Sequence, residues 1–277
     1  MSLKEKKKAK QVSEIAELVQ KADLSNDDIK EIINNQRKKA IKGFYYFLKR
    51  IKINSKSPFE YYKTKNKIKE NGEEAVWHHF LKENDWIIGL NVDLKFIREI
   101  LPEQKIGDED SKGKGSSKTD FLGLSYFTTL IELKTSKTLV FKSVKSSKAR
   151  TNTFDFSSDF IEAYSQTLAQ KSDLSINDKK KIIDTNNIEI DRVTIRTIDP
   201  KCILIIGCRN AEFPHDKDAE HSIKTDCFER LRRDIRNISI ITFDELFERA
   251  YHIVYTNKLP QDWYFKNTDE FINKYLN

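Results

Sequence analysis

The sequence predicts an α/β protein in which helices flank a mixed central sheet, preceded by an all-helical, basic N-terminal domain. Gly and Pro contribute only 8 and 5 of the 277 residues, which is too few for a turn-dense all-β chain. Apolar residues make up 38% of the chain, enough to bury a substantial core. Beyond about residue 70, stretches with helical and strand periodicity alternate, and helices on both faces of a sheet are the simplest packing of that order.

The first 70 residues combine helical periodicity with a large excess of basic residues. Apolar side chains recur at helical spacing over 12–19 and over 29–51, the second run following the candidate caps Ser25-Asn26. Residues 1–70 contain 19 Lys and Arg against 9 Asp and Glu, whereas 71–277 contains 31 against 34, so the net charge of +7 originates in the N-terminal quarter. Such a segment suits a polyanion such as nucleic acid, although a solvated helical surface explains a single lysine cluster equally well.

Asn71-Gly72 ends this pattern, so we predict a helical domain over 1–70 and a second domain over 71–277. Shorter elements alternate from residue 73 onwards. The expected helices cover 73–84, 157–168, 221–235 and the region after 244. The expected strands cover 86–92, 94–100, 119–124, 128–134, 202–207 and 238–242, with a hairpin-like insertion at 188–198 and polar loops at 107–117 and 142–150.

Neither a membrane segment nor a disulfide framework is expected. No stretch approaches the roughly 18 to 20 apolar residues of a membrane helix, and the basic N-terminus lacks an apolar signal sequence, so we expect a cytoplasmic protein. Cys202, Cys208 and Cys227 are odd in number and are expected to be reduced thiols. With His215 and His221 they lack the paired spacing of a structural zinc site.

The two strands on either side of residue 126 contain the residues with the clearest chemistry. If they pair as antiparallel neighbours, Asp120 lies opposite Glu132, and Lys134 shares the face of Glu132. Two carboxylates so close together favour a divalent cation between them. The alternative is an edge-strand salt bridge of Glu132 with Lys134 or Lys118, because exposed ion pairs are common.

The predicted helix 73–84 offers a third acid. Glu74 shares a face with Trp77, His78 and Leu81, and a carboxylate on an apolar face is unusual. Asn71 offers a different explanation, as an N-cap with Glu74 closing a capping box, and the two roles can coexist. A histidine in the position of His78 more often packs or faces solvent than binds a ligand.

Taken in order, these pieces resemble the PD-(D/E)XK nuclease superfamily and, within it, the Shedu family of antiphage immune nucleases. Two departures from the pattern are Thr119, where the superfamily has Pro, and His78, where we expect Gln. The first 70 residues lie outside the resemblance. The resembling pieces are Glu74-Ala-Val-Trp-His-His-Phe-Leu81, Thr119-Asp120-Phe121, Ile131-Glu132-Leu133-Lys134, Ala163-Tyr164-Ser165-Gln166, Ile203-Leu204-Ile205-Ile206-Gly207 and Ile241-Thr242-Phe243-Asp244-Glu245-Leu246.

The resemblance implies a restriction endonuclease-like fold for 71–277, a homo-oligomer that is a dimer or a tetramer, and a DNA substrate. It implies that Asp120, Glu132 and the carbonyl of Leu133 bind Mg²⁺, with Glu74 supporting the metal directly or through water. Mn²⁺ is expected to substitute, because sites with oxygen ligands rarely exclude it. By the same resemblance, Lys134 positions or activates the attacking water and Gln166 orients Lys134 or the nucleophile.

The expected function is therefore metal-dependent hydrolysis of DNA phosphodiester bonds, as an endonuclease or nickase in antiphage defence. Basic residues flank the motif in the sequence and are candidates for phosphate contacts, although solubility explains each equally well. The alternative is a non-catalytic module on a nuclease-like fold that binds nucleic acid or a protein partner. An RNA nuclease is a less favoured third option. The basic candidates are Lys118, Lys142, Lys145, Lys148 and Arg150.

Overall fold

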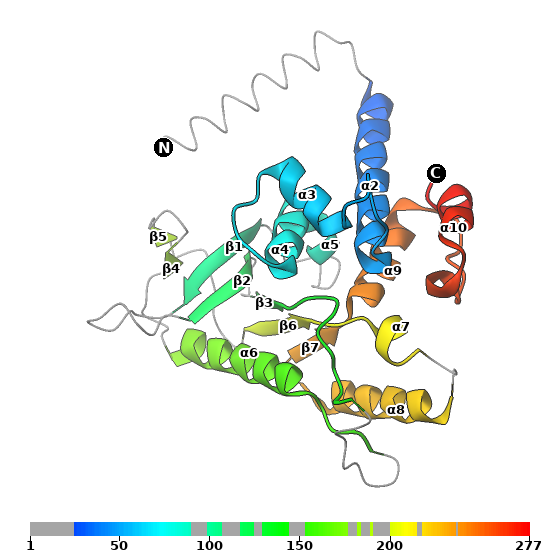
Figure 1. The fold of residues 1–277 in the computed structure, drawn as a ribbon. Helices are drawn as coiled ribbons and strands as arrows, with labels where there is room; N and C mark the ends of the chain where they lie inside the picture. The colour runs from blue at the N-terminus through cyan, green and yellow to red at the C-terminus, as the bar shows by residue number, and fades with distance from the viewer. Residues whose placement is uncertain are drawn as a thin grey trace.

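The computed structural model confirms a mixed α/β protein (Figure 1). It describes residues 25–89, 99–106, 117–124, 129–143, 153–176, 182–183, 189–190, 200–214, 218–236 and 238–277. The helices are α2 (Asn26–Lys49), α3 (Pro58–Asn66), α4 (Glu73–Glu83), α5 (Asp85–Gly89), α6 (Ser158–Ile176), α7 (Arg209–Glu212), α8 (Ala219–Asp234), α9 (Phe243–Val254) and α10 (Thr268–Tyr275), with a 3₁₀ turn, η2 (Trp263–Phe265), before the last.

The strands form one mixed sheet in the order β5-β4-β1-β2-β3-β6-β7. Neighbouring strands from β5 to β3 run antiparallel, whereas β3, β6 and β7 run parallel to one another. β3 is therefore the strand at which the sheet changes from antiparallel to parallel. The strands are β1 (Glu99–Ile106), β2 (Ser117–Leu124), β3 (Thr129–Leu133), β4 (Ile182–Ile183), β5 (Glu189–Ile190), β6 (Lys201–Ile205) and β7 (Ile238–Ile241).

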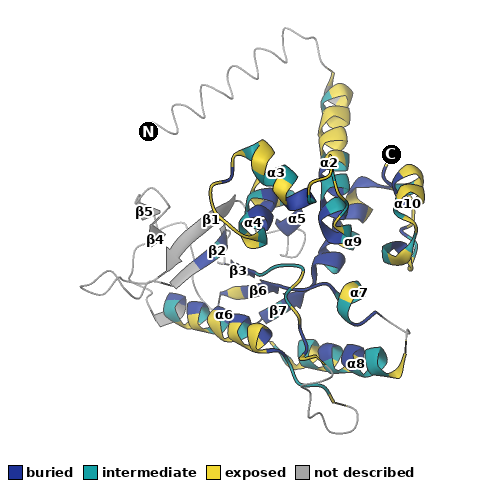
Figure 2. Cartoon of the chain, viewed as in Figure 1, coloured by how far each residue is buried: buried dark blue, intermediate teal, exposed yellow. Residues whose placement is uncertain are grey.

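Each face of the central strands packs against its own layer of helices. Alternate residues along a strand point to opposite faces, so β3 contributes Ile131 to one apolar cluster and Leu130 to the other. The cluster that contains Ile131 includes side chains of α2, α4 and α9, and the cluster that contains Leu130 includes side chains of α6 and α8. Figure 2 shows the central strands as buried between these layers.

The described part of the N-terminal segment is helical and packs against the rest of the chain. Ser25 begins α2 with a capping box to Asp28, as the candidate caps predicted. Farther along this helix, the Phe44 ring lies 5.2 Å from that of Trp77 and 5.7 Å from that of Phe247. α2 thus shares a core with α4 and α9, and the division at residue 70 into two domains stays a prediction.

Two expectations about local structure need correction. The stretch expected as a strand over 86–92 begins instead as the helix α5, and residues 90–92 lie outside the described part. Ile87 and Ile88 are fully buried, and a short apolar run cannot be assigned to helix or strand from its periodicity. The strand expected over 94–100 appears as β1, described from Glu99, and the insertion expected at 188–198 is described only at β5.

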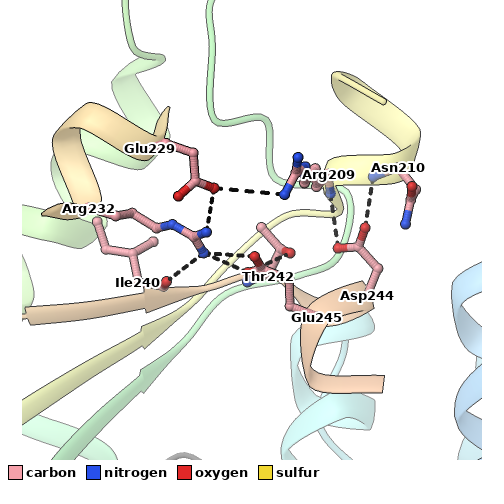
Figure 3. A network of polar contacts seen from close by, with 8 residues as sticks. All are labelled: Arg209, Asn210, Glu229, Arg232, Ile240, Thr242, Asp244 and Glu245. Carbon is pink, nitrogen blue, oxygen red and sulfur yellow. Dashed lines mark hydrogen bonds and ion pairs between the residues drawn. The ribbon is translucent and has the colours of Figure 1, made fainter. Parts of the chain in front are cut away.

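A polar network joins the helices α7, α8 and α9 (Figure 3). The Arg232 guanidinium donates to both carboxylate oxygens of Glu245 at 2.8 Å and to the carbonyl of Ile240 at 3.3 Å. The buried Asp244 carboxylate accepts from the backbone N–H groups of Arg209 and Asn210. These contacts fix the helices at the carboxyl end of β7.

Gly207 fixes the turn after β6 and gives a test of this architecture. Its φ is +67°, and a Cβ atom at this position would lie 2.8 Å from the carbonyl oxygen of Thr138. We expect Gly207→Ala to lower the free energy of unfolding by more than about 2 kcal/mol, because it combines backbone strain with a clash against main chain. Urea unfolding followed by circular dichroism measures this change.

Gly43→Ala is the matched control. Gly43 lies within α2, and an added Cβ would meet only Phe80, at an ordinary 3.7 Å. Because Ala is the better helix former, this variant should raise the free energy of unfolding by up to about 1 kcal/mol. Equal effects of the two substitutions would contradict the packing described for Gly207.

Candidate active site

The register of β2 against β3 brings the two predicted acids together. The strands pair as Phe121 with Ile131 and Leu122 with Leu130, so the register is centred on residue 126 as predicted. The ladder ends at Phe121, and the next contact is made by a side chain: the Leu133 N–H donates to Oδ2 of Asp120 at 2.6 Å. The Asp120 carboxylate therefore takes the place of the next backbone pair.

Glu132 is held in a buried position by a cation and an amide. Only 3% of its surface is exposed. Its Oε1 accepts from Nζ of Lys134 at 3.0 Å, and its Oε2 accepts from Nε2 of Gln170 at 2.7 Å. Lys134 also donates to Oε1 of Gln166 at 3.3 Å. The predicted Glu132, Lys134 and Gln166 thus lie together, with α6 supplying both glutamines.

Gln170 is not among the site residues predicted from the sequence. It lies one helical turn after Gln166 and is 1% exposed, whereas Gln166 is exposed. A signal was present, because Ala163, Thr167 and Leu174 share its buried face at helical spacing. A glutamine in the middle of such a face predicts a buried hydrogen-bond partner.

The acids of the site repel one another. Burial, followed by the charges of Glu132 and Glu74, raises the pKa of Asp120 to about 7, against the opposing effects of the Leu133 N–H and the Lys134 charge. Burial by itself lowers the pKa of Lys134, but the charge of Glu132 and its hydrogen bond outweigh this and raise it overall. The site therefore has more negative charge than Lys134 balances.

This donor set suits a hard divalent cation. Mg²⁺ is usually bound through one or two carboxylates together with water, and Asp120 and Glu132 provide two carboxylates at one end of β3. Among the residues that the structure describes, no three His, Cys, Asp or Glu side chains form a ready-made metal cluster. A Mg²⁺ ion at this site would therefore have few ligands from the protein.

Glu74 differs from what the helix pattern suggested, whereas His78 packs, as a histidine in this position more often does. Glu74 is exposed and lines a cleft, rather than lying on the apolar face of α4. Asn71 forms no capping box, because α4 begins after Gly72 and the Asn71 side chain accepts from Lys63. His78 packs: its ring stacks 4.7 Å from that of Phe121, and its Nε2 lies 3.2 Å from the carbonyl of Asp120.

A cleft of about 920 Å³ opens onto Asp120. One side consists of residues 66–72, the connection between α3 and α4 that Figure 1 shows arching to the start of α4. The helix α4 contributes a second set of lining residues, and Asp120 and Thr135 contribute the rest. An extended ligand therefore has access to the carboxylate of Asp120.

Of the basic loop residues predicted to bind nucleic acid, only the Lys142 side chain is described, and it does not line this cleft. Lys142 is exposed, and its Nζ lies 3.5 Å from Oδ2 of Asp155. The side chain of Lys118 and the residues Lys145, Lys148 and Arg150 lie outside the described part, so their role stays a prediction. All three cysteines are free thiols, as expected.

The chain is therefore a mixed α/β protein whose candidate site, formed by two carboxylates and a lysine, lies where the pairing of β2 with β3 ends. The model of the family described as the C-terminal part of Shedu protein SduA matches residues 71–247, and the chain belongs to this family. It is 31% identical over 191 residues to Shedu protein SduA of Bacillus cereus (strain B4264). That match covers 66% of this chain but 46% of the relative, so the chain spans about half of the relative's length. Within the described residues, no helix is long and apolar enough to cross a membrane.

The two glutamines of α6 give a matched test of the site's geometry. Gln170→Leu removes the donor to Oε2 of the buried Glu132, and we expect it to lower the free energy of unfolding by about 1 to 3 kcal/mol. Gln166→Leu alters an exposed side chain and should cost less than about 0.5 kcal/mol. Urea unfolding of both variants measures the difference, and equal losses would contradict the burial of Gln170.

Proposed function

We propose that this chain is a Mg²⁺-dependent DNA endonuclease or nickase with a restriction endonuclease-like fold, acting in antiphage defence. The proposal rests above all on one observation, the convergence of Asp120, Glu132 and Lys134 at the end of β3 beside an open cleft. Phosphodiester hydrolysis needs relief of negative charge at phosphorus and a positioned water. Two carboxylates for a cation, next to an ammonium group, are suited to both requirements.

Each side chain has a role in this proposal. Asp120, Glu132 and the Leu133 carbonyl would hold Mg²⁺, with Glu74 supporting it from the cleft. The metal would supply Lewis acidity and lower the pKa of a bound water. Lys134 would position the attacking water and add compact positive charge near the phosphate. Gln166 would orient Lys134, while Gln170 would keep Glu132 from turning away.

The proposal also includes the biological role, the location and the oligomeric state of the chain. Membership of the Shedu family supports a role in antiphage defence, and we propose DNA as the substrate. We propose a cytoplasmic homo-oligomer, a dimer or a tetramer, in which Mn²⁺ can replace Mg²⁺.

One observation favours a second candidate function. Both carboxylate oxygens of Glu132 accept hydrogen bonds from within the chain, from Lys134 and Gln170. If these bonds persist when Mg²⁺ is present, the fold serves to bind nucleic acid or a protein partner without cleaving it. Such a module would shift the mobility of a supercoiled plasmid without nicking it.

Cleavage of supercoiled plasmid DNA tests the catalytic assignment. With Mg²⁺, the wild-type chain should convert the plasmid to nicked or linear forms, and Asp120→Ala and Lys134→Ala should each lower the rate at least about 100-fold. The matched controls are Asp226→Ala, on the exposed face of α8, and Lys258→Ala, in an exposed turn. Undiminished cleavage by Asp120→Ala would reject the site, and cleavage of RNA alone would reject DNA as the substrate.

Binding of Mg²⁺ can be measured without relying on cleavage. A ligand present at 100 times its Kd raises the free energy of unfolding by about 2.7 kcal/mol, so Mg²⁺ should raise the Tm of the wild-type chain. Asp120→Ala should abolish this increase, EDTA should reverse it, and Mn²⁺ should reproduce it. An equal increase in wild type and Asp120→Ala would place the metal elsewhere.

A further inference from the structure

The cleft beside Asp120 changes in charge along its length. On α4, Glu74, His78 and Lys82 follow one another at intervals of four residues, and all three line the cleft. Residues at this spacing lie on one face of a helix, and eight residues of helix rise about 12 Å. The charge therefore changes from acidic beside Asp120 to basic at the far end of the same helix face.

The connection between α3 and α4 adds two more cations to this cleft. Lys67 and Lys69 are exposed, and both line it. Lys67 ends α3 in a left-handed conformation, with φ of 54°, which breaks the helix and starts the connection. Glu70 lies on the same segment and offsets one of the positive charges.

Lys67, Lys69 and Lys82 differ from the other basic groups nearby, because no described residue pairs with their ammonium groups. Within the described residues, no ion pair or hydrogen bond engages the ammonium groups of Lys67, Lys69 and Lys82. Arg50 and Lys137, by contrast, both bind Glu73. The carboxylates of Glu70, Glu73, Glu74 and Asp120 also line the cleft, so the three lysines mark the positions at which the phosphates of an anionic ligand would bind.

We propose that this cleft is a track for a single strand of nucleic acid, whose phosphates bind Lys67, Lys69 and Lys82 while an adjacent phosphodiester reaches Asp120. This inference rests on the proposed function and assigns phosphate contacts that the sequence analysis had expected in the loops around 118 and 142–150. The volume of about 920 Å³ accommodates a short stretch of one strand.

The rings in the cleft fit the same occupant. Single-strand sites combine a basic groove with flat side chains on which bases stack. His78 and His79 both line the cleft and are only partly buried. They lie on α4 between the acidic residue Glu74 and the basic residue Lys82, where the bases of such a strand would pass.

Fluorescence anisotropy with a labelled single-stranded DNA 20-mer tests the track, at several salt concentrations and in EDTA so that no cleavage occurs. The triple variant Lys67→Ala, Lys69→Ala, Lys82→Ala should bind at least about tenfold more weakly than wild type. The slope of log K against log[salt] should fall by about 2, because each lost contact to a single strand removes about 0.7. The control triple variant Lys201→Ala, Lys258→Ala, Lys274→Ala removes the same charge from exposed sites that do not line the cleft, and should bind like wild type.

An unchanged salt slope in the cleft variant, or an equal loss of binding in the control variant, would overturn the track. A loss of binding confined to duplex DNA, with single-strand binding intact, would also overturn it. Circular dichroism verifies that both triple variants are folded. The plasmid assay keeps the two proposals distinguishable. Weaker single-strand binding by the cleft variant supports the track even if the wild-type chain never nicks DNA. Nicking by the wild-type chain supports the proposed enzyme even if the cleft variant binds normally.

Discussion

The contact between the Asp120 carboxylate and the Leu133 N–H is the constraint on which the site depends. It lies where the pairing of β2 with β3 ends and holds Asp120 in a place where burial and the charge of Glu132 raise its pKa against the opposing effect of this hydrogen bond. Like charges in a partly buried place persist only where the surrounding structure holds them. Here the parallel pairing of β3 with β6 and the bond from Gln170 to Glu132 provide that support.

The support extends to Thr119, which stands where the pattern that the sequence resembles has proline. Thr119 is buried, and its hydroxyl lies 3.1 Å from the carbonyl of Phe121 and 3.2 Å from that of Ile131. This hydroxyl can therefore donate to either strand directly beside Asp120. Such a contact offers the two strands a link that a proline at this position, lacking a hydroxyl, would not provide.

The elements and contacts predicted from the sequence are correct where the periodicity is strict and wrong where it is ambiguous. An antiparallel pair centred on residue 126 predicts the register of β2 and β3 that the structure shows, and in this register Asp120 approaches Glu132. The prediction of a strand over 86–92 is wrong at its start, because a short apolar run fits either period. The capping box at Asn71 failed because Lys63, distant by eight residues, competes for the same side chain. Gln170 was visible in the pattern, but only the structure shows that its partner is Glu132.

The central claim is that Asp120 and Glu132 hold a divalent cation, and a crystal of this chain soaked in Mn²⁺ tests it most directly. We expect an anomalous difference peak within about 2.5 Å of the Asp120 and Glu132 carboxylates and the Leu133 carbonyl oxygen, with Lys134 remaining beside it. An absence of density there at saturating Mn²⁺, with the Lys134 and Gln170 bonds to Glu132 intact, would contradict the proposed metal site.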